Sequence, residues 1–190
     1  MRISLDFDGV LSQTMELWCT RYNEVYPTRI PITVNDIKHW SFFIDFGMDV
    51  TQAFEIFDWC WGHWEQLPQM EACQDDKTRR LMELGEVDLV TSVDAKHTED
   101  VFKWLKSHKI KYNNLVHKEA KQELSYDIFI DDSPINAVNI ARQNKICLLY
   151  NQLWNRGLIG RNIIRVYSLD HAIDKIKDKL TIPNPYDQIK

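Results

Sequence analysis

The chain has 190 residues, of which 44% are hydrophobic and 27% are charged, a balance typical of one globular core domain with room for an insert. Its formal net charge is -5, so no overall basic field would draw it to nucleic acid or to an anionic membrane surface. We therefore expect neither nucleic acid nor a membrane as a partner, and we expect local cations to hold any anionic ligand.

The cysteines and the first residues bear on the cellular compartment. The four cysteines show neither a Cys-x-x-Cys pair nor a His-rich metal spacing, which favours reduced thiols in a cytoplasmic protein. Arg2 and Asp6 lie in a segment typical of a core strand, so we expect no signal peptide. No apolar run approaches the ~20 residues of a membrane span. A homodimer stays open at this stage.

The first eleven residues predict a strand that is followed directly by two carboxylates and a turn. An apolar segment up to Leu5 predicts a buried strand, and Gly9 supplies a tight turn directly after Asp6 and Asp8. The two carboxylates would lie at the carboxyl end of a strand, the edge where open α/β sheets bind ligands. A solvated Asp-x-Asp turn is the alternative interpretation, because short acidic turns are common.

The middle of the chain interrupts a pattern that is otherwise regular. Residues 14–26 have helical spacing, residues 41–48 are aromatic and irregular, and residues 49–64 predict one or two helices. From residue 75 the sequence predicts helix 75–84, strand 87–91, helix 97–108, a short strand near 115–116, strand 127–131, helix 134–143, strand 145–149, helix 169–180 and a tail with Pro183 and Pro185.

This order predicts an α/β fold with a doubly wound, mostly parallel Rossmann-like sheet, strand order 3-2-1-4-5 and right-handed crossovers. Residues 1–14 and 75–190 would form the core domain. Residues 15–74 do not fit the alternation, and we expect a small helical, aromatic-rich cap inserted after the first strand; this segment is called the insert below. Motifs far apart in the sequence would then meet in one crevice beneath the insert.

Further polar residues follow or precede the later strands. They are Thr91 and Ser92 after the second strand, Asp131 and Asp132 after the fourth, and Lys121 ten residues before that acid pair. A hydroxyl at a strand end can be a simple cap, and Lys121 can be a surface lysine with Lys118 as its rival. The nucleophile strand, the hydroxyl strand, the lysine and the acid pair follow one another in the order that resembles the haloacid dehalogenase superfamily of aspartate-based phosphatases.

The resemblance implies a two-step phosphate transfer. Asp6 would attack phosphorus and form an aspartyl-phosphate, while Asp8 would protonate the leaving oxygen and later activate water. The implied cofactor is Mg²⁺, whose ligands would be the Asp6 carboxylate, the Asp8 main-chain carbonyl and Asp131, with Asp132 close behind. The implied phosphate-binding residues are Thr91, Ser92 and Lys121.

Within the superfamily, the chain looks most like the 5'(3')-deoxyribonucleotidase family. The matching features are Asp-Phe-Asp-Gly-Val-Leu at residues 6–11, the aromatic insert, Leu67-Pro68, Thr-Ser at residues 91–92, and the stretch 126–132. Members remove phosphate from deoxyribonucleoside monophosphates with magnesium, so the resemblance implies a small-molecule nucleotide substrate. The family has Ser-Pro and a nearby lysine where this chain has Ser92-Val93-Asp94. Lys96 either replaces that lysine or is a solvated residue at a helix start.

The insert holds five of the seven tryptophans, and its aromatic run from residue 40 to 46 is hard to bury whole. We expect Trp40, Phe42 and Phe43 to line a slot for a nucleobase, for which stacking contributes about 1–3 kcal/mol. The alternative is that the rings form the core of the insert, which we expect of Phe54 and Phe57 especially. Two other functions stay open: a phosphatase of the same mechanism for another small phosphoester, and a non-catalytic protein that binds phosphate or Mg²⁺.

Overall fold

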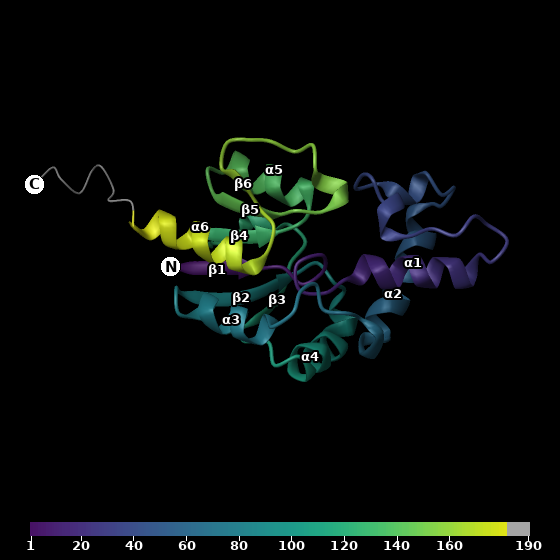
Figure 1. Cartoon of the computed structure of the whole chain (residues 1–190), viewed down its shortest axis with the longest axis horizontal. Coiled ribbons are helices and arrows are strands. Elements are labelled where there is room, and N and C mark those ends of the chain that lie inside the picture. The colour runs from purple at the N-terminus through teal and green to yellow at the C-terminus, as the bar shows by residue number, and fades with distance from the viewer. Residues whose placement is uncertain (182–190) are drawn as a thin grey trace, which may run out of the picture.

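A six-stranded parallel sheet forms the centre of the computed structural model, which describes residues 1–181 (Figure 1). The strand order is β3-β2-β1-β4-β5-β6. The strands are β1 (Arg2–Leu5), β2 (Glu86–Thr91), β3 (Leu115–His117), β4 (Ile128–Asp131), β5 (Ile146–Tyr150) and β6 (Ile163–Val166). The α/β class and the order 3-2-1-4-5 are confirmed for the first five strands. Pro183 and Pro185 lie outside the described residues.

The sixth strand is a correction to the sequence prediction, which stopped at five. β6 pairs with β5 at the edge of the sheet, and the first three of its four residues are half-buried or exposed. Arg165 interrupts its apolar run and donates hydrogen bonds to the main-chain oxygens of Asn155 (2.8 Å) and Leu158 (2.9 Å). A short, half-polar edge strand lacks the apolar run on which the prediction of strands relied.

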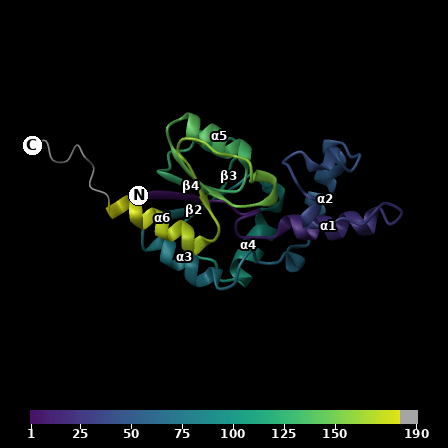
Figure 2. The same ribbon diagram turned by 45° about the horizontal axis from the view of Figure 1, so that its top comes forward.

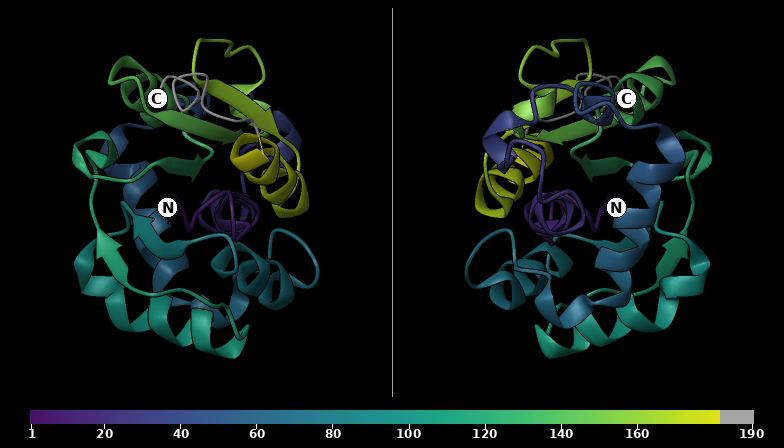
Figure 3. Two further views of the ribbon diagram at one scale, coloured as in Figure 1. Left: turned by 90° about the vertical axis from the view of Figure 1, so that its left-hand side faces the viewer. Right: turned by 90° about the vertical axis from the view of Figure 1, so that its right-hand side faces the viewer.

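Helices cover both faces of the sheet. The helices α3 (Gln74–Met82), α4 (Thr98–Ser107) and α6 (Leu169–Thr181) pack against one face, where their apolar residues join the larger buried cluster. The helix α5 (Pro134–Arg142) packs against the other face through Ala137 and Ile140, with Phe129 of β4. The view along the long axis shows α3 and α6 side by side and α5 across the sheet from them (Figure 3). Successive side chains of a strand point to opposite faces of the sheet, so the buried residues form one cluster on each face.

The insert projects beyond the carboxyl ends of the strands (Figures 1 and 2). Its long helices are α1 (Thr14–Val25) and α2 (Val50–Gly62), and its 3₁₀ turns are at Val34–Asp36, Phe42–Ile44 and Trp64–Gln66. The helix α2 begins where the Asp49 carboxylate accepts a hydrogen bond from the Gln52 N–H at 2.8 Å. The two helices are joined through Trp18, whose indole N–H donates to the Ala53 main-chain oxygen at 3.0 Å.

A buried carboxylate in β2 holds several segments together away from the insert. Asp88 accepts hydrogen bonds from the Tyr126 hydroxyl (2.7 Å), the Asn114 amide (2.8 Å) and Arg2 (3.1 Å). Burial by itself would raise the pKa of Asp88, but these donors together lower it below its ordinary value. Within residues 1–181, no helix combines the length and the apolar character that crossing a bilayer requires.

Candidate active site

A cavity of about 900 Å³ lies where the insert faces the carboxyl ends of the strands. From the core it is lined by Asp6, Asp8, Ser92 and Asp132, and from the insert by aromatic rings that include Trp40, Phe42, Phe43, Phe54 and Trp61. Parallel strands end at the same edge of a sheet, which is why residues more than 100 positions apart meet here. The cavity therefore lies beneath the insert at the carboxyl ends of the strands, where the sequence predicts a crevice.

Directly behind the lining of the cavity, a buried lysine bridges two carboxylates. The Lys121 Nζ lies 2.7 Å from Asp6 Oδ1 and 2.9 Å from Asp131 Oδ2, and all three residues are buried. Burial by itself would lower the pKa of Lys121, but the charges of Asp131 and Asp6 more than offset this and raise it. The surface-lysine interpretation is therefore wrong for Lys121. Its rival Lys118 instead pairs with Glu123 at 2.7 Å.

The carboxylate cluster holds more negative charge than Lys121 balances. Oxygen atoms of Asp6, Asp131 and Asp132, one from each, lie within 4.8 Å of one another. Burial raises the pKa of Asp6 to about 8, against the opposing charge of Lys121 and with the help of Asp131. Burial also raises the pKa of Asp132 well above its ordinary value. Such a cluster would be relieved by a cation.

The two acids of the pair have different partners. Asp131 accepts from the Ser133 N–H (2.8 Å) and from the Asn136 amide (3.1 Å), in addition to Lys121. Asp132 Oδ2 accepts from the Trp154 indole N–H at 2.9 Å. Asp132 lines the cavity, whereas Asp131 lies behind it with Lys121. Asp131 therefore anchors the lysine, and Asp132 faces the open space.

Asp8 lies two residues after Asp6 in the same cavity wall but is held by another set of donors. Its Oδ1 accepts from the hydroxyls of Thr14 and Ser12, the latter at 3.3 Å. The indole N–H of Trp61 lies 3.2 Å from Oδ2 and 3.3 Å from Oδ1. Burial raises the pKa of Asp8, although these hydrogen bonds oppose the shift. Its side chain is thus separate from the cluster that Asp6 belongs to.

The two residues of the predicted hydroxyl pair lie differently. Ser92 is exposed and lines the cavity. Thr91 ends β2, is fully buried, and accepts a hydrogen bond from the Val93 N–H at 3.1 Å. Lys96 also lines the cavity and forms an ion pair at 2.6 Å with Asp58 of α2. The Lys96 side chain is 53% exposed at the start of the helical segment before α4, and its ion pair joins the core to the insert.

The aromatic residues of the insert divide into core and cavity wall. Phe42 is only 4% exposed and packs edge-on against Trp18 at a centroid distance of 4.9 Å, although it also lines the cavity. Phe43 is half-buried, and Trp40 is 39% exposed. Both of these rings line the cavity. Of the three predicted slot residues, Trp40 and Phe43 are the ones with area left for a ligand.

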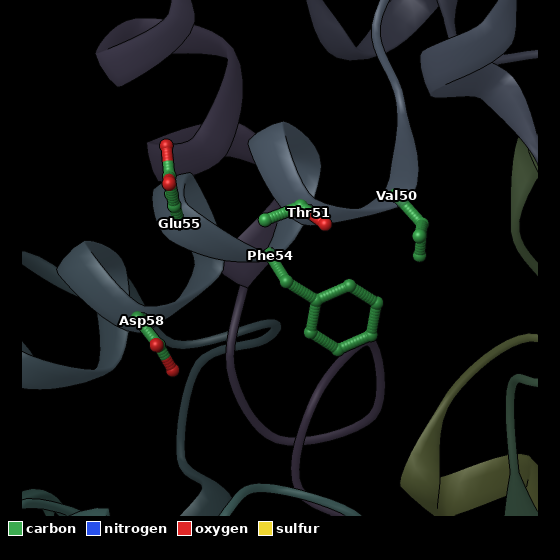
Figure 4. A pocket seen from close by; sticks show the side chains of 5 residues that line it. All are labelled: Val50, Thr51, Phe54, Glu55 and Asp58. Carbon is green, nitrogen blue, oxygen red and sulfur yellow. The ribbon is translucent and has the colours of Figure 1, made fainter.

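A smaller hollow of about 340 Å³ lies along α2 and is lined by Val50, Thr51, Phe54, Glu55 and Asp58 (Figure 4). Phe54 and Val50 point the same way, opposite to Glu55, and both also line the large cavity. Phe54 is 52% exposed, so the expectation that it belongs to the core of the insert is wrong. Phe57, in contrast, is half-buried and packs against Trp18 and Trp61.

Several residues of the site were not found by reasoning from the sequence. Trp61 entered the sequence analysis only as one of the aromatic residues of the insert, and Trp154 did not enter it, yet each donates an indole hydrogen bond to a carboxylate of the site, Asp8 and Asp132 respectively. Gln152 donates to the Gly9 main-chain oxygen at 2.7 Å. No local spacing marks a tryptophan as a hydrogen-bond donor, so only the contact itself could have identified them.

Comparisons with known proteins agree with this geometry. A family model described as 5' nucleotidase, deoxy (pyrimidine), cytosolic type C protein matches residues 1–180. A 5'(3')-deoxyribonucleotidase of Clostridium acetobutylicum is 26% identical over 183 residues, which cover 94% of this chain and 97% of that protein. A nucleotidase of the same organism is 21% identical over 188 residues, covering 94% and 96%. A haloacid dehalogenase-like hydrolase from Streptococcus pneumoniae has the same fold, with a TM-score of 0.62 at 14% identity over 92% of this chain and 97% of that one.

Proposed function

Since the chain belongs to the 5' nucleotidase, deoxy (pyrimidine), cytosolic type C protein family, and is thus an enzyme of the nucleotidase and phosphatase type, we propose that it removes phosphate from deoxyribonucleoside or ribonucleoside monophosphates. The reaction would use Mg²⁺ and an aspartyl-phosphate intermediate. The observation that carries the proposal is a cluster of buried carboxylates with one lysine, at the floor of a cavity walled by aromatic rings.

The proposed chemistry begins at Asp6. Its carboxylate attacks phosphorus and forms a new O–P bond, while the bond from phosphorus to the nucleoside oxygen breaks. Asp8 gives its proton to that leaving oxygen. Water then attacks the aspartyl-phosphate, Asp8 takes a proton from this water, and phosphate leaves with Asp6 restored. Both acids line the same cavity, which supports the division of roles.

The donor set fits Mg²⁺, because this ion prefers oxygen ligands and is bound through few carboxylates. With Lys121 charged, the ionised cluster of Asp6, Asp131 and Asp132 has a net charge of -2, which a divalent cation would balance. We propose that Asp6, Asp132 and the Asp8 main-chain carbonyl hold the ion. Asp131 is the weaker candidate, because it does not line the cavity and its oxygens already accept from Lys121, the Ser133 N–H and the Asn136 amide. The bound ion would neutralise the charge of the phosphoryl oxygens.

The insert supplies the proposed selectivity. We propose that residues 15–74 cap the core domain of residues 1–14 and 75–190, and that Trp40 and Phe43 stack with the nucleobase. Both rings line the cavity and keep exposed area. Ser92, directly after β2, would donate to the phosphoryl group, with Thr91 and Lys121 supporting it from behind. All four cysteines are free thiols, which suits the cytoplasm as the place of action.

A panel of phosphomonoesters tests the proposal. Phosphate release would be measured for the four deoxyribonucleotides, the four ribonucleotides and a baseless ester, each with Mg²⁺ and with EDTA. We expect Mg²⁺-dependent release that is faster for nucleotides than for the baseless ester. Equal rates on all esters would leave a phosphatase for another small phosphoester. No release from any ester would leave a protein that binds phosphate or Mg²⁺ without turnover.

A further inference from the structure

Trp61 connects the insert to a carboxylate of the core. It lies in the last turn of α2, is 7% exposed, and directs its indole N–H to both oxygens of Asp8, at 3.2 and 3.3 Å. These residues are 53 positions apart in the sequence. A tryptophan indole can donate but cannot accept, so this contact favours the arrangement in which Asp8 presents its oxygens to the ring.

The contact is the one that fixes the second oxygen of Asp8. Oδ1 also accepts from the hydroxyls of Ser12 and Thr14. Among the hydrogen bonds of residues 1–181, the partner of Oδ2 is the indole of Trp61. Without that donor, only Oδ1 of the carboxylate would keep a hydrogen-bond partner, and the group could rotate about its Cβ–Cγ bond. A turned carboxyl group would place its proton away from the leaving oxygen.

The indole ring is itself held by contacts with two other rings. Its ring stacks on Phe57 with a centroid distance of 5.6 Å and an interplanar angle of 22°, and it lies 5.7 Å from the ring of His97. One turn earlier in α2, Asp58 contacts Lys96 at 2.6 Å and His97 at 3.3 Å. These contacts fix the end of α2 against the core, so Trp61 has little freedom to follow a moving carboxylate.

We propose that Trp61 is a positioning residue that orients the Asp8 carboxyl group for proton transfer to the leaving oxygen, a role that rests on the proposed function. The insert then does more than recognise the substrate, because it also completes the hydrogen bonds of the acid. The ring of a phenylalanine would fill most of the same space and keep the contacts with Phe57 and His97. It would remove only the N–H.

The test compares esters that differ in their need for an acid. One ester is the best nucleotide of the panel, an alkyl phosphate whose leaving group is an alkoxide that needs a proton. The other is p-nitrophenyl phosphate, whose leaving group is a stable phenolate. The quantity is kcat/KM, which reports the step in which the leaving group departs. Trp61→Phe should lower kcat/KM about 10- to 100-fold for the nucleotide. For p-nitrophenyl phosphate we expect a loss of less than about threefold, since little proton transfer is required.

Trp18→Phe is the matched control. Its indole N–H also makes one buried hydrogen bond in the insert, at 3.0 Å to a main-chain oxygen of α2, but it does not contact Asp8. This variant should have a lower melting temperature and the wild-type ratio of kcat/KM for the two esters. An unchanged ratio in Trp61→Phe, whether both rates fall or neither does, would overturn the positioning role alone. Wild-type protein that hydrolyses neither ester would overturn the proposed function and this role with it.

Discussion

Gly9 offers a sharp test of the carboxylate cluster, because its backbone and its neighbour both exclude a side chain. Its φ is +72°, in the left-handed region, and a Cβ built there would lie 2.2 Å from Asp132 Oδ2 and 2.5 Å from Asp132 Cγ. No substitution at this position can avoid the carboxylate unless Asp132 moves. We therefore expect Gly9→Ala to displace the acid that is proposed to hold the metal ion.

The size of the effect follows from two contributions. An alanine in the left-handed region costs about 1–2 kcal/mol. Moving Asp132 also breaks its 2.9 Å hydrogen bond from Trp154, and a bond to a charged group contributes about 1.5–3 kcal/mol. We expect the free energy of unfolding to fall by about 2.5–5 kcal/mol in total. A displaced ligand should weaken the apparent affinity for Mg²⁺ about 10- to 100-fold.

The assay combines thermal unfolding with a Mg²⁺ titration of phosphate release. Gly47→Ala is the control, because Gly47 has a φ of +64° and nothing lies within 4 Å of a Cβ placed there. This control should lose about 1–2 kcal/mol of stability and keep the wild-type dependence on Mg²⁺. If Gly9→Ala kept both its Mg²⁺ dependence and its kcat/KM, the position of Asp132 would not matter and the proposed metal ligands would be wrong.

Three further predictions concern the nucleophile, the insert and the core. Asp6→Asn should abolish turnover in a protein that still folds, since an amide cannot attack phosphorus as a carboxylate does; a retained rate above a few per cent would exclude Asp6 as the nucleophile. Phe42→Ala should lower stability by about 3–5 kcal/mol and impair all esters alike. Phe43→Ala should instead lower kcat/KM about 5- to 150-fold for nucleotides alone, and an equal loss on a baseless ester would argue against the nucleobase slot. The lowered pKa of Asp88 contributes stability that is fully present above its unfolded value of about 3.9 and is lost as the pH falls through the folded value. Asp88→Asn should therefore flatten the acid side of the stability profile, and an unchanged profile in thermal melts from pH 2 to 7 would contradict this.

The sequence contained enough information for the sheet because its strands are marked by apolar runs between amphipathic segments. β1 and β4 are buried throughout or nearly so, and each is followed directly by acids. The same rule failed for β6, whose exposed Ile164 and paired Arg165 conceal a strand that is held by its neighbour rather than by burial. Edge strands depend on hydrogen bonds to one partner, and these leave no periodic trace in the sequence.

The site was predictable where topology alone decides and unpredictable where packing decides. Asp6 and Asp132 meet because the parallel strands β1 and β4 end at one edge, a consequence of the strand order. In the insert, α2 has apolar residues on more than one side: Ala53 and Ile56 are buried, whereas Phe54 is half exposed to the cavity. Periodicity cannot choose between two apolar faces of a helix, so the wall of the cavity could not be told from its core.

The buried charges explain why the fold can assemble this site but would leave it incomplete without a cation. Lys121 lies between Asp6 and Asp131, and removing carboxylates from water is tolerable only when each has a partner of opposite charge or several donors. Asp132 has a neutral indole as its donor, so its charge remains uncompensated at the cavity wall. Burial raises the pKa of Asp6 to about 8, and the charge of Asp131 adds to this shift while that of Lys121 opposes it. A divalent ion bound by Asp6 and Asp132 would lower the pKa of both carboxyl groups and so favour the ionised form of Asp6 that the proposed attack on phosphorus requires.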